Sequence, residues 1–174
     1  DKLDDANIGK VNYYFPIKNL TSGEGFATIQ AAIDDADTQN GDVINVDEGT
    51  YTLTDAVKIT KGITLQGNNN NLVVKPILNG TGNATNKALI EIDAPNVTVK
   101  NLELQIAQDV NAMIGISSTS TDNFNNLTVA DNIFKGTKVQ ATGVVWTSFG
   151  MKLGRGSAEV MGGVVNNSVN VVRN

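Results

Sequence analysis

Short runs of β-branched residues recur along the chain, and four of them end in the same way. The phrases at residues 63–68, 97–101, 127–132 and 163–167 each reach an asparagine. These asparagines are 33, 31 and 35 residues apart, and they are Asn68, Asn101, Asn132 and Asn167. A near-constant period of this size is typical of stacked repeat units. The pattern therefore predicts a coil of short strands in which equivalent residues lie above one another.

Further strand-like runs lie between these phrases. They occupy residues 43–46, 57–59, 72–74, 77–78, 89–92, 113–116 and 143–146. Parallel strands normally need a helical crossover, but no long helical pattern interrupts residues 41–174. A solenoid avoids this need because each coil returns the chain to the next layer, about 4.8 Å away. We therefore expect an all-β solenoid; an antiparallel β-sandwich of short strands is the alternative.

The four marked asparagines have a structural interpretation in such a coil. Asparagine side chains at equivalent bends hydrogen-bond along the stack and form ladders. We therefore expect Asn68, Asn101, Asn132 and Asn167 to be ladder residues and not a binding site.

One segment near the N-terminus has a helical pattern. Its apolar positions share one face at spacings of 3, 4 and 3 residues, and they are Phe26, Ile29, Ile33 and Ala36. We expect a helix over about residues 26–37, with Thr21 or Ser22 as its N-cap. Residues 1–20 form an N-terminal extension whose strand-like run, 11–15, ends at Pro16. Residues 21–174 form a single domain.

Composition narrows the function classes. The 174-residue chain has 18% charged residues and 23 asparagines, so its surface is polar but weakly charged. Its net charge of −5 argues against nucleic acid and anionic membrane surfaces as partners. No run approaches the ~20 apolar residues that span a bilayer, so we expect no membrane insertion. The sequence lacks Cys and His, which removes thiolate nucleophiles and the commonest general base.

Residues 26–51 carry a family resemblance. The run Phe-Ala-Thr-Ile-Gln-Ala-Ala-Ile-Asp-Asp-Ala, then Gly-Asp-Val-Ile-Asn-Val and Glu-Gly-Thr-Tyr, resembles the start of right-handed parallel β-helix proteins of the pectin lyase-like superfamily. The phrases at 63–67 and 97–104 resemble later coils of the same superfamily. The resemblance covers about residues 22–174 and implies a right-handed parallel β-helix with an N-terminal capping helix. It implies no single activity, because the superfamily includes lyases, hydrolases, tailspikes, adhesins and surface proteins.

Catalytic residues are not evident. Enzymes of the superfamily use clustered acidic residues, with calcium and a basic residue in the lyases, whereas here Asp93, Asp109, Asp122 and Asp131 form no tight motif. Asp131 and Lys100 occupy near-equivalent positions, and we interpret them as a surface ion pair. We expect no cofactor and no catalytic site. The alternative is Ca²⁺ held by hard carboxylate oxygens, which are offered by Asp34, Asp35, Asp37 and Asp42.

Two groups of surface residues are candidates for contact with glycans. Trp146 and Phe149, with Arg155 nearby, suit stacking on sugar rings and contact with an acidic sugar. Glycosylation sequons are also frequent, although they arise often by chance in a chain rich in Asn and Thr. Their asparagines are Asn19, Asn79, Asn83, Asn96, Asn126 and Asn166.

These observations favour an extracellular structural protein, a surface or filament-forming subunit. In this hypothesis the C-terminal end of the coil is uncapped and pairs head-to-tail with the N-terminal segment of another copy. The assembly residues would be Tyr13, Tyr14, Phe15, Val169 and Val171. The alternative is a carbohydrate-active β-helix, as in a polysaccharide lyase, hydrolase or tailspike fragment, or an adhesin module that binds cell-surface glycans.

Overall fold

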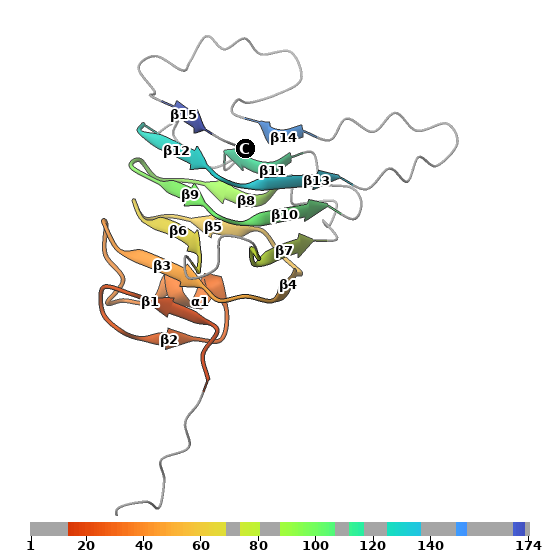
Figure 1. Cartoon of the computed structure of the whole chain (residues 1–174). Coiled ribbons are helices and arrows are strands. Elements are labelled where there is room, and N and C mark those ends of the chain that lie inside the picture. Colours follow the sequence, from red (N-terminus) through yellow and green to blue (C-terminus); the bar gives the residue numbers. More distant parts are fainter. Residues whose placement is uncertain are drawn as a thin grey trace, which may run out of the picture.

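The structure is a computed structural model that describes residues 14–68, 74–80, 88–106, 112–116, 125–136, 149–152 and 169–172. In these residues the chain forms fifteen strands and one short helix (Figure 1). The strands are β1 (Ile17–Asn19), β2 (Gly25–Phe26), β3 (Val43–Val46), β4 (Thr50–Leu53), β5 (Val57–Ile59), β6 (Thr64–Gly67), β7 (Ile77–Gly80), β8 (Ala88–Ile92), β9 (Thr98–Lys100), β10 (Glu103–Ile106), β11 (Ala112–Ile116), β12 (Leu127–Ala130), β13 (Ile133–Gly136), β14 (Phe149–Lys152) and β15 (Val169–Val172). The helix is α1 (Ile29–Asp34).

The strands form three sheets. Sheet A has the order β15-β12-β9-β6-β3-β1-β2, sheet B the order β13-β10-β7-β4, and sheet C the order β14-β11-β8-β5. From β3 to β15 the chain visits the sheets in the repeating order A, B, C, and each strand pairs in parallel with its counterpart one turn away. Figure 1 shows these strands stacked in chain order. The prediction of an all-β architecture of mostly parallel strands is confirmed, and among the described strands the alternative sandwich is wrong.

Apolar columns line the interior because side chains alternate between the two faces of a strand. In sheet A the register places Ile44 beside Leu65, and Leu65 beside Val99. Val99 lies beside Val129, and all four side chains are fully buried. Burying one such side chain stabilises the fold by about 1.5–3 kcal/mol. Sheets B and C supply further members of the same cluster, among them Leu78, Leu104, Ile59, Ile90 and Ile92.

The register shows that the repeats differ in length. Along sheet A, Asn45 aligns with Gln66, and Gln66 with Lys100. Lys100 aligns with Ala130, and Ala130 with Val172. These positions are 21, 34, 30 and 42 residues apart, so the near-constant period was wrong. The strands stay in register because the links between them take up different numbers of residues.

The described members of the predicted asparagine ladder do not occupy equivalent positions. Continuing the register past β9 and β12 places Asn101 beside Asp131, and Asn132 beside Leu102. The side-chain nitrogen of Asn132 donates to the Val99 carbonyl (2.9 Å), and its oxygen accepts from the N–H of Leu102 (3.1 Å). The register therefore contradicts a ladder built on these residues.

The other two marked asparagines are Asn68 and Asn167, and of these Asn68 departs from the prediction. The side-chain nitrogen of Asn68 donates to Oδ1 of Asp47, its neighbour in the preceding coil (3.0 Å). Asn167 lies outside the described residues.

Equivalent asparagines do occur at the two ends of strands β9 and β12. Asn96 and Asn126 precede β9 and β12 with φ of 59° and 59°, and Nδ2 of Asn126 donates to Oδ1 of Asn96 (2.8 Å). Asn101 and Asp131 follow the same strands with φ of 56° and 57°. Among residues other than glycine, Asn and Asp tolerate this left-handed conformation best. The repeating phrase is therefore Asn-x-Thr-Val-x-(Asn or Asp).

Helix α1 is shorter than the predicted helix over residues 26–37. Phe26 lies in β2, where it pairs with Ile17. Thr28 is the N-cap, and its hydroxyl accepts from the N–H of Ala31 (3.1 Å). Asp35 has an extended ψ of 139° and ends the helix. The apolar face was predicted correctly in its centre, because Ile29 and Ile33 are buried.

Two details of the N-terminal region were predicted wrongly. Thr21 and Ser22 do not cap α1; their backbone N–H groups donate to Oδ1 of Asn19 in the turn after β1. A strand, β1, begins directly after Pro16. Of the predicted strand-like run 11–15, the described residues Tyr14 and Phe15 lie in no strand. β1 pairs antiparallel with both β2 and β3, which places residues 17–19 inside sheet A.

Candidate functional site

The outward face of sheet A carries two columns of polar side chains. Thr64, Thr98 and Thr128 align on adjacent strands and are half-buried. Two residues further along the strands, the register aligns Asn45 with Gln66, and Nε2 of Gln66 donates to Oδ1 of Asn45 (3.3 Å). Lys100 continues this second column on β9. The columns face outward because the residues between them belong to the buried apolar set.

Sheet B carries an ion pair on its outward face. Nζ of Lys135 on β13 lies 2.8 Å from Oε1 of Glu103 on β10, and Gln105 donates a second hydrogen bond to the same oxygen. Glu103 is 8% exposed, and this burial alone would raise the pKa of its carboxyl group. The hydrogen bonds from Lys135 and Gln105 and the charge of Lys135 outweigh burial and hold that pKa below its ordinary value. The Glu103 carboxylate is therefore ionised at neutral pH, and Lys135 and Gln105 already bind its Oε1.

Sheet C carries a carboxyl group of the opposite character. Glu91 on β8 is half-buried, and burial raises its pKa, with Asp93 adding to the shift and Lys58 opposing it. Lys58 aligns with Glu91 on the neighbouring strand β5, and Gly115 aligns with it on β11. A half-buried carboxyl group with a raised pKa could exchange a proton with a ligand.

Asp47 organises the turn between β3 and β4. Its Oδ2 accepts from the hydroxyl of Tyr14 (2.9 Å), and its Oδ1 accepts from Asn45 (3.3 Å) and Asn68 (3.0 Å). Its carbonyl accepts from the hydroxyl of Tyr51 (2.9 Å). The hydrogen bond to Asp47 raises the pKa of Tyr14, and burial raises the pKa of Tyr51 to about 12. Both tyrosines therefore stay protonated at neutral pH.

A buried polar network lies beneath α1. The side-chain nitrogen of Asn19 donates to the hydroxyl of Thr38 (3.1 Å) and to Oδ2 of Asp42 (2.8 Å). The N–H of Gln39 donates to the same carboxylate oxygen (2.9 Å). The bonds from Asn19 and then Gln39 hold the pKa of Asp42 below its ordinary value. The network joins β1, the segment after α1 and the start of β3.

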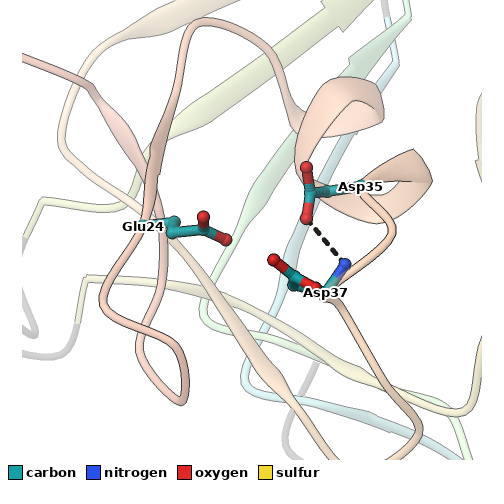
Figure 2. Close-up of side chains that lie close together, drawn as sticks. All are labelled: Glu24, Asp35 and Asp37. Carbon is teal, nitrogen blue, oxygen red and sulfur yellow. Dashed lines mark hydrogen bonds between the residues drawn. The ribbon is translucent and has the colours of Figure 1, made fainter.

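Three carboxylates gather beside the end of α1 (Figure 2). Glu24 precedes β2, while Asp35 and Asp37 follow the helix, and one oxygen of each lies within 4.8 Å of the others. The N–H of Asp37 donates to Oδ1 of Asp35 (2.9 Å), as the dashed line in Figure 2 shows. Such hard oxygens suit Ca²⁺ or Mg²⁺, and the remaining ligands would be water or backbone carbonyls.

This cluster shares two members with the calcium site predicted from the sequence. Asp35 and Asp37 are brought together, but Glu24 takes the place of the other two. Asp34 instead accepts from the amide of Gln30 (2.8 Å), and Asp42 belongs to the buried network. The sequence could not point to Glu24, because only the pairing of β2 with β1 carries it to the helix end.

The predicted assembly residues lie at opposite ends of the stack. Tyr14 is 70% exposed, and Phe15 is 38% exposed with its ring against Gly25. Val169 and Val171 lie in β15, in register with Leu127 and Val129 of β12. Tyr13 lies outside the described residues.

The predicted glycan contacts are described only in part. Phe149 begins β14 and aligns with Ala112, whereas Trp146 and Arg155 lie outside the described residues. The predicted neighbours Asp131 and Lys100 are offset by one position, because Lys100 aligns with Ala130.

Among the sequon asparagines, Asn96 and Asn126 are exposed at their corner and Asn79 is half-buried in β7. Asn83 and Asn166 lie outside the described residues. Asn19 is 0% exposed, and its side-chain nitrogen is occupied by the buried network. The fold therefore leaves no room for a glycan at Asn19.

Sequence reasoning missed Glu91 and Glu103 as site residues. Each stands at a polar position of an apolar strand, in Ala-Leu-Ile-Glu-Ile and Glu-Leu-Gln-Ile. A carboxylate between buried aliphatic neighbours was a usable signal in both cases. The partner of Glu103, Lys135, lies 32 residues further along the chain, and only the strand register brings the two together.

Comparisons with known proteins bear on the fold as a whole. No helix in the described part of the chain is long and apolar enough to span a membrane. Comparison with curated proteins and with solved structures found no match. The family model described as rhamnogalacturonase A/epimerase, pectate lyase-like, matches residues 18–172, which include every strand from β3 to β15. This match spans most of the sequence and agrees with the parallel sheets, so the chain belongs to the pectate lyase-like family.

Proposed function

We propose that the protein is a carbohydrate-binding parallel β-helix that holds a polysaccharide along an outward face. The observation that carries this proposal is the set of polar columns, kept in register from coil to coil, on a member of a family named for rhamnogalacturonase and pectate lyase. A repeating polar surface matches a repeating polymer, because each coil offers the next sugar unit a similar set of hydrogen-bonding groups.

The architecture that we propose is a closed, right-handed coil with a covered N-terminal end. Its support is the repeating order of sheets A, B and C and the single apolar cluster to which all three contribute. Helix α1 packs against β1, β2, β3 and β5, and its buried Ile29 and Ile33 belong to that cluster. A helix in this position keeps the apolar cross-section of the first coil away from water.

Binding without cleavage fits the described carboxyl groups. Hydrolysis of a glycosidic bond commonly needs two carboxyl groups that flank the bond. Glu91 and Glu103 lie on different sheets, and Glu103 is already paired with Lys135. Among the described residues, neither glutamate faces a second carboxyl group across a space where a glycosidic bond could lie.

Head-to-tail assembly and a cell-surface location stay predictions. A parallel strand from another copy would need the free edge of β3, and β1 already occupies that edge. A polymer that continued sheet A through this end would therefore have to displace β1. Light scattering at increasing concentration tests this: polymers that disappear on deletion of residues 1–15, which leaves β1 and Asn19 in place, would restore the assembly hypothesis.

A binding panel tests the proposed function. The protein is titrated with rhamnogalacturonan, polygalacturonate and several neutral polysaccharides by isothermal calorimetry, and unsaturated product is followed by absorbance with and without calcium. We expect binding to at least one polymer and no product. Absence of binding to every polymer would overturn the proposal, and calcium-dependent product would replace binding with lyase activity.

A further inference from the structure

We propose that the outward face of sheet A is the binding surface and that its ligand is an uncharged, extended polysaccharide lying across the strands. This inference rests on the proposed carbohydrate function and adds the face, the direction and the charge class of the ligand. The two polar columns defined above carry it: the threonine column of Thr64, Thr98 and Thr128, and the amide column of Asn45, Gln66 and Lys100.

The threonine column is regular because the strands are in register. Adjacent strands lie about 4.8 Å apart, so the column presents one hydroxyl group at this spacing along the stack. Positions two residues apart on a strand are separated by about 7 Å, which sets the distance to the amide column. The two columns therefore form a flat lattice that runs along the stack, and the length of its step is similar to that of one sugar unit in an extended chain.

The hydroxyl groups of this column are available to a ligand. Each of Thr64, Thr98 and Thr128 is half-buried and therefore reachable from the solvent. Within the described residues their hydroxyl groups make no side-chain hydrogen bond. Threonine is β-branched and restricted at χ1, so little rotamer freedom is lost when a ligand binds. The threonine hydroxyls therefore form a row whose positions are already fixed before a ligand binds. Such a row suits a polysaccharide, which presents a row of hydroxyl groups of its own.

The amide column is ordered along the same direction. Gln66 donates to Asn45 one coil below, which turns the side chains of the two residues along the stack. Asn45 is 6% exposed and its nitrogen donates to Asp47, so it orders the column from below. The half-buried Gln66 is the amide that faces a ligand, and its oxygen can accept from a sugar hydroxyl. Lys100 completes the column, and its ammonium can donate to a sugar oxygen.

The charge of the surface decides the class of polysaccharide. Two lysines lie on this row, Lys100 on β9 and the exposed Lys18 on β1, which aligns with Asn45. The positions between them and the threonine column are uncharged, whereas a polyanion would be favoured by a cation at each step along its length. The outward faces of sheets B and C are different, since they carry Glu103 with Lys135 and Glu91 with Lys58. Sheet A is therefore the face that fits a neutral chain.

The test replaces the three hydroxyl groups without changing side-chain shape. The variant T64V/T98V/T128V is compared with the wild type and with T50V/T52V, a control whose exposed threonines lie on β4 of sheet B. Circular dichroism and thermal melting confirm folding. Binding is measured to cellulose, chitin, xyloglucan and dextran as neutral probes, and to polygalacturonate as the acidic probe.

We expect the wild type to bind a neutral probe with little sensitivity to salt. The triple variant should bind at least about tenfold more weakly, since each lost hydrogen bond costs a factor of about two to ten. The control should bind like the wild type. If the triple variant unfolds, T98V alone should still weaken binding by about two- to tenfold.

Three outcomes would overturn the inference. Neutral-probe binding that is unchanged in the triple variant would leave the proposed function standing but move it to another face. Salt-sensitive binding to polygalacturonate alone would assign the protein an acidic ligand. Inhibition of ice recrystallisation that the triple variant loses, without polysaccharide binding, would give the threonine column a different ligand and would contradict the proposed function as well.

Discussion

The N-terminal end and the later coils use the same kinds of polar residue in opposite ways. At the N-terminal end Asn19, Thr38 and Asp42 turn inward, are 0%, 1% and 6% exposed, and hydrogen-bond to one another. In the later coils Thr98 and Thr128 face outward from sheet A, with Val99 and Val129 buried beside them. Polar composition alone therefore does not mark a binding surface. Groups of the same kind hold β1 and the segments beside it together at the N-terminal end and form an outward row on the later strands of sheet A.

Removal of an inward amide should have the largest effect. We expect Asn19→Ala to lower the free energy of unfolding by about 3 kcal/mol, because Asp42 loses a hydrogen bond while it stays buried. The outward control Gln66→Ala should cost about 0.5 kcal/mol or less. Urea denaturation measures both. Equal losses would break the distinction between the two regions.

Acid should weaken the N-terminal end next. Hydrogen bonds from Asn19 and Gln39 hold the pKa of Asp42 below its ordinary value of about 3.9. A depressed pKa gives stability that is present above about pH 4 and is lost as the pH falls through the folded-state pKa. Melting temperatures measured on both sides of pH 4 should fall more steeply for the wild type than for Asp42→Asn. Parallel curves would show that Asp42 does not contribute to acid sensitivity.

The ion pair of sheet B should show a smaller effect. Lys135→Met leaves the Glu103 carboxylate without its cation at 8% exposure, and we expect a loss of about 1 kcal/mol. The ion pair stabilises the fold only modestly, because the Lys135 side chain is 57% exposed and water screens its charge. Adding Glu103→Gln should recover part of the loss, and a double-mutant cycle measures the coupling. Additive losses would mean that the pair is not coupled.

Calcium should give the smallest effect. If Glu24, Asp35 and Asp37 bind Ca²⁺ with the affinity of extracellular modules, a dissociation constant of about 1 mM, then about 1 mM calcium stabilises the fold by about 0.4 kcal/mol. Thermal melting with calcium or with chelator measures this. Glu24→Gln should abolish the difference, whereas Asp34→Asn should preserve it. A shift that persists in Glu24→Gln would place the ion elsewhere.

The sequence was sufficient for the repeated strands and insufficient for their register. Alternating phrases such as Val-Thr-Val-Lys predicted parallel strands without helical crossovers, because apolar residues on one face need a shared interior. The strand-ending asparagines gave a wrong alignment of the repeats. Asn101 has a left-handed backbone conformation and Asn132 does not, but the two look alike in the sequence. The shared phrase at 96–101 and 126–131 would have given the correct alignment.

The candidate sites were less accessible from the sequence. Asp35 and Asp37 were predicted together because they are neighbours in the chain, but Glu24 joins them through strand pairing. The buried role of Asp42 depends on Asn19, 23 residues away. Contacts of this kind follow from strand pairing between distant segments and leave no local pattern in the sequence.

The most direct test measures thermal stability and polysaccharide binding on one variant, T64V/T98V/T128V. If the outward columns serve a ligand and not the fold, the melting temperature should stay within about 2 °C of the wild type while binding to the neutral polysaccharide falls at least about tenfold. A variant that melts much earlier but still binds like the wild type would contradict the account, because it would show that these threonines support the fold in the same way as the inward network.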